Sequence, residues 1–122
     1  MILALGVALA GGVGAGLRWL ADVGLRRWRR RGFPWPILLV NVVGCFTLAF
    51  LTGSGALISA DLQTVVGTGL LGGFTTFSTV SVDAAEMWRQ RRYRGAIGNA
   101  AGTLLLCIVA SVAGLVASFP VA

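Results

Sequence analysis

The sequence predicts an all-α membrane protein, with residues 1–122 forming a single domain of four transmembrane helices. Hydrophobic residues make up 57% of the chain and charged residues only 11%, whereas a soluble domain carries about 25% charge. Four apolar stretches each come near or exceed the roughly 20 residues that span a bilayer. We expect the spans at about residues 2–21, 33–52, 62–87 and 95–118.

Local signals support each span in turn. The first stretch opens with MILALGVALAGG and lacks the basic region of a signal peptide, so we interpret it as a membrane span. Pro34 stands just before the second stretch, where the first helical turn tolerates a missing N–H. Asp61 is placed to cap the third stretch, and Pro120 closes the fourth.

The basic residues predict the orientation of the chain. All ten are arginines, and nine of them lie in two clusters, RRWRRR at 26–31 and RQRRYR at 89–94. The clusters join spans one to two and three to four, so they share one side of the membrane. The positive-inside rule makes that side cytoplasmic and both termini external, in the inner (plasma) membrane of the cell. We interpret the arginines as topology determinants that touch anionic lipid, and expect no nucleic-acid partner.

Several chemistries find little support in the sequence. The chain has no histidine, and Cys45 and Cys107 fall in separate apolar stretches, so a zinc or transition-metal site has almost no candidates. No nucleophile, base and orienting group converge, so we do not expect an enzyme. A small multidrug transporter of four helices would need an embedded carboxylate in its first span, and residues 2–21 contain none.

The third stretch carries an unusual run, GLLGGFTTFST at residues 69–79. Non-helical backbone at membrane depth is tolerated only where it is buried in protein or lines a wet cavity. The glycines at 69, 72 and 73 could supply such a break, or they could simply let helices pack closely. We expect the third helix to be broken near its middle. Carbonyls at a break suit a cation, and the amides of the resumed helix favour an anion. Hydroxyls follow at Thr75, Thr76, Ser78 and Thr79.

Other polar residues lie within the apolar stretches. Asn41 offers an uncharged N–H donor, or it pins two helices together. Arg18 either anchors its span at the interface or draws anions into a vestibule. No carboxylate lies near the middle of any span, and neutral donors suit an anion that must lose water without being trapped by a fixed charge. A polar stripe on the fourth span indicates a wet path or close packing, through Asn99, Thr103, Cys107 and Ser111.

Three motifs resemble those of the CrcB/Fluc family of small fluoride channels. They are GGVGAGLRW in the first span, NVVGCF in the second and GTGLLGGFTTFST in the third. The resemblance implies an antiparallel dimer with two pores that exports cytoplasmic fluoride down its gradient and so relieves fluoride toxicity. It also implies a structural sodium ion at the dimer centre, held in this chain by the carbonyls of Gly72 and Thr75.

The resemblance further assigns roles to individual residues. Arg18 matches the vestibule arginine of the family. Two positions depart from the family pattern, since Val80 stands where a second phenylalanine is usual and Cys107 where a serine is common. A thiol is a weaker hydrogen-bond donor than a hydroxyl. The expected pore-lining residues are Asn41, Phe77, Ser78, Thr79, Val80, Thr103 and Cys107.

The strong arginine asymmetry bears on the dimer. An antiparallel homodimer needs each chain to insert in both orientations, which requires little bias in basic residues. The nine-to-zero bias favours a heterodimer with an oppositely oriented sister subunit, although a homodimer remains an alternative. The departures at Val80 and Cys107 leave open a second alternative, a non-conducting sister subunit that completes a heterodimeric fluoride channel.

Overall fold

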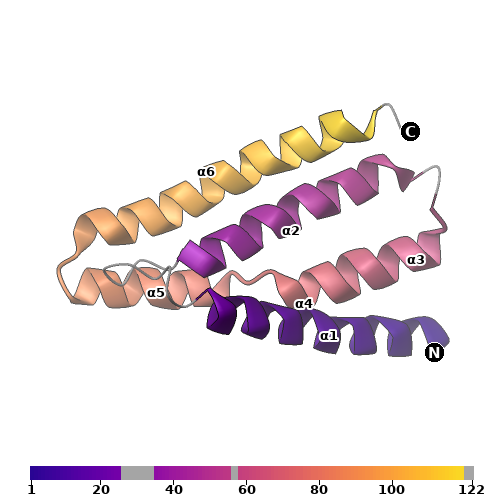
Figure 1. Cartoon of the computed structure of the whole chain (residues 1–122), viewed down its shortest axis with the longest axis horizontal. Helices are drawn as coiled ribbons and strands as arrows, with labels where there is room; N and C mark the ends of the chain where they lie inside the picture. The colour runs from indigo at the N-terminus through magenta and orange to yellow at the C-terminus, as the bar shows by residue number, and fades with distance from the viewer. Residues whose placement is uncertain (26–34, 56–57, 120–122) are drawn as a thin grey trace.

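A computed structural model describes residues 1–25, 35–55 and 58–119 of the chain (Figure 1). Within these residues, four helical segments are long and apolar enough to cross a membrane, which confirms the predicted fold class. The arginine cluster at 26–31 lies outside the described residues, as do Pro34 and Pro120. The segments are Ile2–Gly24, Trp35–Gly53, Ala60–Arg89 and Tyr93–Ser118.

The first, second and fourth spans are continuous helices, and the third is divided. Helix α1 covers Ile2–Gly24, α2 covers Trp35–Gly53 and α6 covers Tyr93–Ser118. The third span consists of α3 (Ala60–Thr64), the π-helical segment η4 (Val65–Leu71), α4 (Gly72–Phe74) and α5 (Ser78–Arg89).

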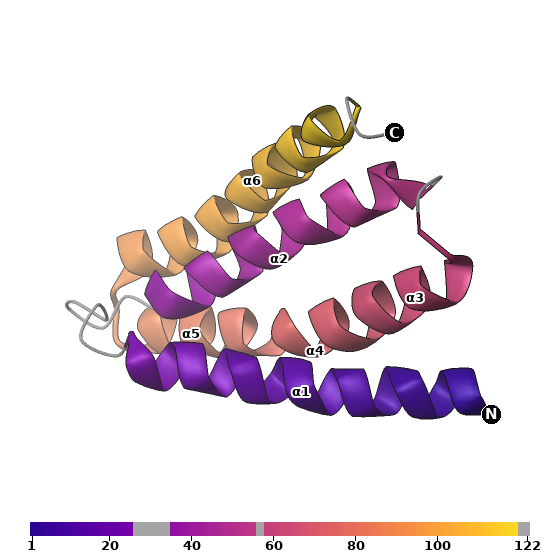
Figure 2. The ribbon, with the colours of Figure 1, turned by 45° about the vertical axis from the view of Figure 1, so that its right-hand side comes forward.

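The spans run back and forth between two ends of the molecule. The end of α1, the start of α2 and the α5–α6 turn lie together at one end, and the start of α1 and the end of α6 lie at the other (Figures 1 and 2). Helix α2 packs mainly along α6, whereas α1 packs along η4 and α4. At the α5–α6 turn, Arg89 pairs with Glu86 on the surface, with 2.8 Å between Nη2 and Oε1. Arg91 follows with φ 62, a left-handed conformation suited to a tight turn.

The start of the third span differs from the expectation in its cap. Ser59, in an extended conformation, is the N-cap, and its hydroxyl accepts the Leu62 N–H at 3.2 Å. Asp61 therefore does not cap the helix; it lies inside the first turn, where its charge favours the positive end of the helix dipole. The π-helical turns of η4, which sequence periodicity did not indicate, follow directly.

Of the two roles that the sequence left open for the glycines, the structure shows close packing. Gly72 is helical, with φ −62 and ψ −38, whereas Thr75 is extended, with φ −82 and ψ 159. The helix therefore ends after the glycines. The glycines instead allow close contact with α1: a Cβ on Gly73 would overlap the carbonyl oxygen of Gly11, and one on Gly14 would overlap that of Leu70.

Candidate functional site

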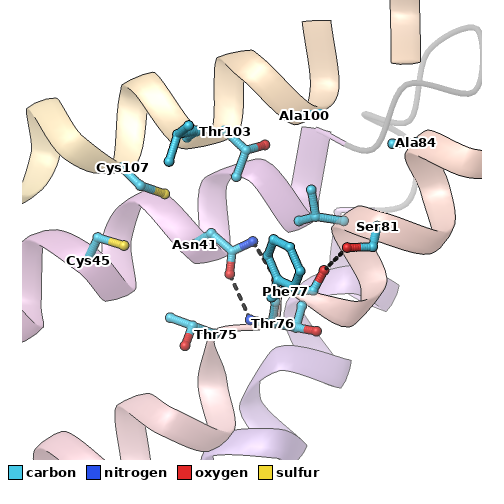
Figure 3. A pocket seen from close by; sticks show the side chains of 12 residues that line it. Asn41, Cys45, Thr75, Thr76, Phe77, Ser81, Ala84, Ala100, Thr103 and Cys107 are labelled. Carbon is cyan, nitrogen blue, oxygen red and sulfur yellow. Dashed lines mark hydrogen bonds between the residues drawn. The ribbon is translucent and has the colours of Figure 1, made fainter. Parts of the chain in front are cut away.

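The centre of the site is the non-helical backbone at Thr76, which a side chain from another span holds. Asn41 on α2 donates from Nδ2 to the Thr76 carbonyl at 2.9 Å, and its Oδ1 accepts the Thr76 N–H at 2.8 Å (Figure 3). Asn41 is 5% exposed and Thr76 8%. Because no water reaches a backbone buried at membrane depth, this amide replaces the hydrogen bonds that the break removes.

The Thr76 hydroxyl then starts the next helix. It accepts the Thr79 N–H at 3.2 Å and donates to the Thr79 hydroxyl at 3.2 Å, and the Ser78 hydroxyl lies 3.3 Å away. This is the local side-chain bonding by which Ser and Thr end one backbone pattern and begin another. Sequence reasoning did not assign Thr76 a site role. A threonine two residues ahead of a resumed helix is a signal that could have indicated it.

A pocket of about 330 Å³ lies beside the break, between α2, α5 and α6 (Figure 3). Its lining contains no charged side chain among the described residues. The structure does not bring Ser78 and Thr79 into this lining, since both turn to Thr76 on the first turn of α5. The predicted pore residues that line it are Asn41, Phe77, Val80, Thr103 and Cys107.

Two residues of the pocket lining, Asn41 and Thr103, carry uncharged donor groups. The Asn41 amide nitrogen carries two N–H groups, and its bond to Thr76 uses one of them. The Thr103 hydroxyl is buried and has no hydrogen-bond partner within the described part of the chain. Most threonines in helices bond a carbonyl one turn back, as Thr47 does, whereas the buried Thr103 hydroxyl makes no such bond.

The side chains around these donors are fixed or exposed in distinct ways. Phe77 is 83% exposed and stands at the edge of the pocket, immediately before α5. Val80 is buried, and its carbonyl accepts Asn99 Nδ2 at 3.2 Å. Asn99, part of the stripe predicted on the fourth span, therefore ties α6 to α5, while Thr103 and Cys107 of that stripe line the pocket.

Arg18 reaches the break from α1. Its Nη1 donates to the Thr75 carbonyl at 3.3 Å, and the residue is half-buried. Because α1 continues for six residues beyond Arg18, about 9 Å at 1.5 Å per residue, the guanidinium lies within the span and beside the break. Arg18 is not part of the pocket lining, so its positive charge lies near the pocket but outside it.

The carbonyls of Gly72 and Thr75 fit a hard cation in their donor chemistry. In an unbroken helix the Thr76 N–H would bond to the Gly72 carbonyl, but here it donates to Asn41. The Gly72 residue is exposed, and the Thr75 carbonyl already accepts one bond from Arg18. Among the residues with described positions, no group of three or more His, Cys, Asp or Glu could hold a metal ion. Unwound backbone carbonyls are a known means of binding sodium.

Comparison with known proteins adds the family. The family model described as CrcB-like protein, Camphor Resistance (CrcB), matches residues 5–115. The chain is 42% identical over 120 residues to the fluoride-specific ion channel FluC of Rhodospirillum centenum, covering 96% of this chain and 92% of that protein. It is 37% identical over 116 residues to the fluoride-specific ion channel FluC 1 of Leifsonia xyli subsp. xyli, covering 93% and 85%. A FluC of Caulobacter vibrioides is 40% identical over 113 residues, covering 89% of each chain. Because these matches extend over nearly the whole chain, the protein belongs to the CrcB family.

Proposed function

We propose that this chain is a subunit of a fluoride-specific ion channel that lets cytoplasmic fluoride leave the cell down its gradient and so relieves fluoride toxicity. Membership of the CrcB family and the similarity to proteins named as fluoride-specific ion channels support the proposal. The structural observation that carries it is the pocket without charged side chains among the described residues, whose lining includes Asn41 and Thr103.

The chemistry of the pocket suits a small anion. Fluoride holds its water strongly, so a pathway must supply hydrogen-bond donors as the water is removed. Asn41 and Thr103 are neutral donors, and they can replace water without holding the ion as a fixed positive charge would. The positive edge of the Phe77 ring and the N-terminal end of α5 act with the same sign. Arg18, beside the break, raises the local concentration of anions without standing in the pocket.

We further propose that the working channel is an antiparallel pair, with the arginine clusters of this chain on the cytoplasmic side of the inner membrane. Phe77 and Gly72 are exposed on this chain, so both are available to a partner. The nine-to-zero distribution of arginines favours one insertion direction and therefore a sister subunit of opposite orientation.

A structural sodium ion at the centre of the pair belongs to the same proposal. The Gly72 and Thr75 carbonyls are the groups of this chain that would hold it. Bound there, the ion would neutralise backbone dipoles that the broken helix leaves without partners. We expect the thermal midpoint of the purified pair to fall when sodium is replaced by a large organic cation, with potassium as the control for ionic strength.

The first test is fluoride efflux from liposomes that contain this chain alone, followed with a fluoride electrode. Chloride-loaded liposomes serve as the control for selectivity. Fast fluoride-selective efflux supports the channel and shows a competent homodimer. If the folded, reconstituted chain is silent, the same assay is run with an oppositely oriented sister subunit. Silence of the pair as well would contradict the proposed function.

The orientation has its own test. A reporter that is active only in the cytoplasm is fused to the C-terminus of the singly expressed chain. We expect an external C-terminus in nearly every molecule. Equal populations of the two orientations would overturn the heterodimer and favour a homodimer. Replacing Val80→Phe in the conducting assembly then measures what the missing aromatic ring contributes to the efflux rate.

A further inference from the structure

Two thiols from different spans meet in the wall of the pocket. Cys45 on α2 and Cys107 on α6 both line it, and both are free and half-buried. Figure 3 shows the two sulfur atoms at the same edge of the pocket, where α2 and α6 lie side by side. The fold without a metal therefore already places two sulfur ligands beside each other.

The number and kind of ligands restrict the metal. Thiolate sulfur is a soft donor and selects soft metal ions over magnesium, calcium or manganese. Structural zinc needs four ligands, and the described residues offer no third His, Cys, Asp or Glu near this pair. Two sulfur ligands without a third suit ions that accept linear two-coordination, which are silver(I), copper(I) and mercury(II).

The net charge of the complex with two thiolates distinguishes these three ions. On binding, two S–H bonds break, two metal–sulfur bonds form and two protons leave to water. With mercury(II) the resulting complex is neutral, whereas silver(I) or copper(I) leaves a net charge of −1. The pocket offers no charged side chain among the described residues to balance that charge, and an unpaired charge away from water is disfavoured far more than a neutral group.

We propose that Cys45 and Cys107 together form a two-coordinate binding site for a soft divalent cation of the mercury(II) class, bridging α2 and α6 inside the pocket. The bound ion shares the pocket wall with Asn41 and Thr103. It therefore obstructs the pocket that the proposed function assigns to fluoride. That consequence rests on the proposed function, but the binding itself does not.

The experiment measures mercury(II) retained by the purified, detergent-solubilised chain against increasing glutathione, together with the number of thiols left free. The wild-type chain is expected to retain one mercury(II) with both thiols consumed. Cys45→Ser and Cys107→Ser each bind through one sulfur only. Because the second sulfur acts at high effective concentration, each variant should lose mercury(II) at about 100-fold lower glutathione. Gel filtration checks that each variant is folded, and Cys45→Ala and Cys107→Ala repeat the measurement.

Two controls are needed. The first decides whether both thiols come from one chain, and the second decides whether the charge of the complex determines which metal is preferred. An equimolar mixture of the two single variants should behave as the single variants do, and recovery of wild-type retention would overturn a site within one chain. The second thiol should increase the retention of silver(I) against glutathione less than it increases the retention of mercury(II). An equal increase for the two ions would overturn the argument from charge. Equal retention by wild-type and single variants would overturn the site itself.

Fluoride efflux is a separate readout in liposomes, with each variant normalised to its own metal-free rate. Mercury(II) followed by glutathione should leave the wild-type channel blocked by at least about tenfold relative to either single variant. If metal-free protein shows no efflux in any assembly, the proposed function fails while the retention measurement still decides the mercury site. If mercury(II) is retained and efflux continues, the claim that the site obstructs the pathway is wrong.

Discussion

The two halves of the third span are held in place by different means. The first half, Ala60–Phe74, packs on α1, where glycine backbones on both sides approach each other directly. The second half, α5, packs on α6 and is tied by hydrogen bonds from Asn99 to the Val80 carbonyl and from Thr79 N–H to Thr76. The span thus changes its principal neighbour at the break.

This difference separates a scaffold from a site. Close packing of small residues against α1 leaves little room for added side-chain atoms on that side, so the first half fixes the position of the break. Hydrogen bonding leaves donors and acceptors near the pocket, where small changes in partners alter the chemistry. We therefore expect the first half to be sensitive to added volume and the break to be sensitive to lost polar atoms.

The largest effect is expected at the break itself. Asn41→Ala removes both partners of the Thr76 backbone and leaves a buried N–H and a buried carbonyl unsatisfied. Each such group is worth about 1–3 kcal/mol in the free energy of unfolding. The thermal midpoint in detergent should fall sharply, and fluoride efflux should be lost. Thr47→Ala on the same helix, whose hydroxyl bonds only the Val43 carbonyl, is the control and should change little.

The second effect tests the packed half. Gly14→Ala places a methyl group on the Leu70 carbonyl oxygen, and overpacking of this kind costs about 1–3 kcal/mol in the free energy of unfolding. Gly12→Ala meets no atom within 4 Å and is the matched control on the same helix. Both changes gain the same helix propensity, so their difference in thermal midpoint isolates the clash. Equal midpoints would mean that the close approach does not hold the first half.

A smaller effect is expected from the hydroxyl that starts α5. Thr76→Val keeps the shape of the side chain and removes the acceptor of the Thr79 N–H. Loss of such a cap costs about 1 kcal/mol in the free energy of unfolding. Thr64→Val in the first half removes a hydroxyl that bonds the Ala60 carbonyl, and we expect a lesser change there. If the two variants had the same thermal midpoint, the two halves would not differ in their dependence on polar atoms.

The smallest effect lies at the exposed end of the second half. Glu86→Gln breaks the surface pair with Arg89 and leaves the rest of α5 untouched. Exposed pairs contribute little to stability because water and salt screen both charges. The thermal midpoint and the fluoride efflux rate should match those of the wild-type chain at physiological salt. A clear loss of stability would show that polar bonds matter along the whole second half and not only at the break.

Local features of the sequence were enough to predict the architecture. The four spans follow from the length of each apolar stretch, because a bilayer requires about 20 apolar residues for each crossing. The break was predicted from a cluster of polar and small residues inside one stretch, because polar groups at membrane depth must be bonded within the protein or line a wet cavity. The family motifs follow from the residues themselves. Neutral donors such as Asn41 and Thr103 could be recognised by residue type alone.

Only the tertiary structure decided what these residues contact. Whether a glycine bends a helix or admits a neighbour depends on what packs against it; here α1 packs closely on the glycines, and the helix ends at Thr75. That Asn41 holds Thr76, and that Cys45 and Cys107 line the same pocket, depends on how α2 is placed against the break and against α6. These contacts join residues far apart in the chain. They arise from the packing of whole helices, which no local pattern of residues specifies.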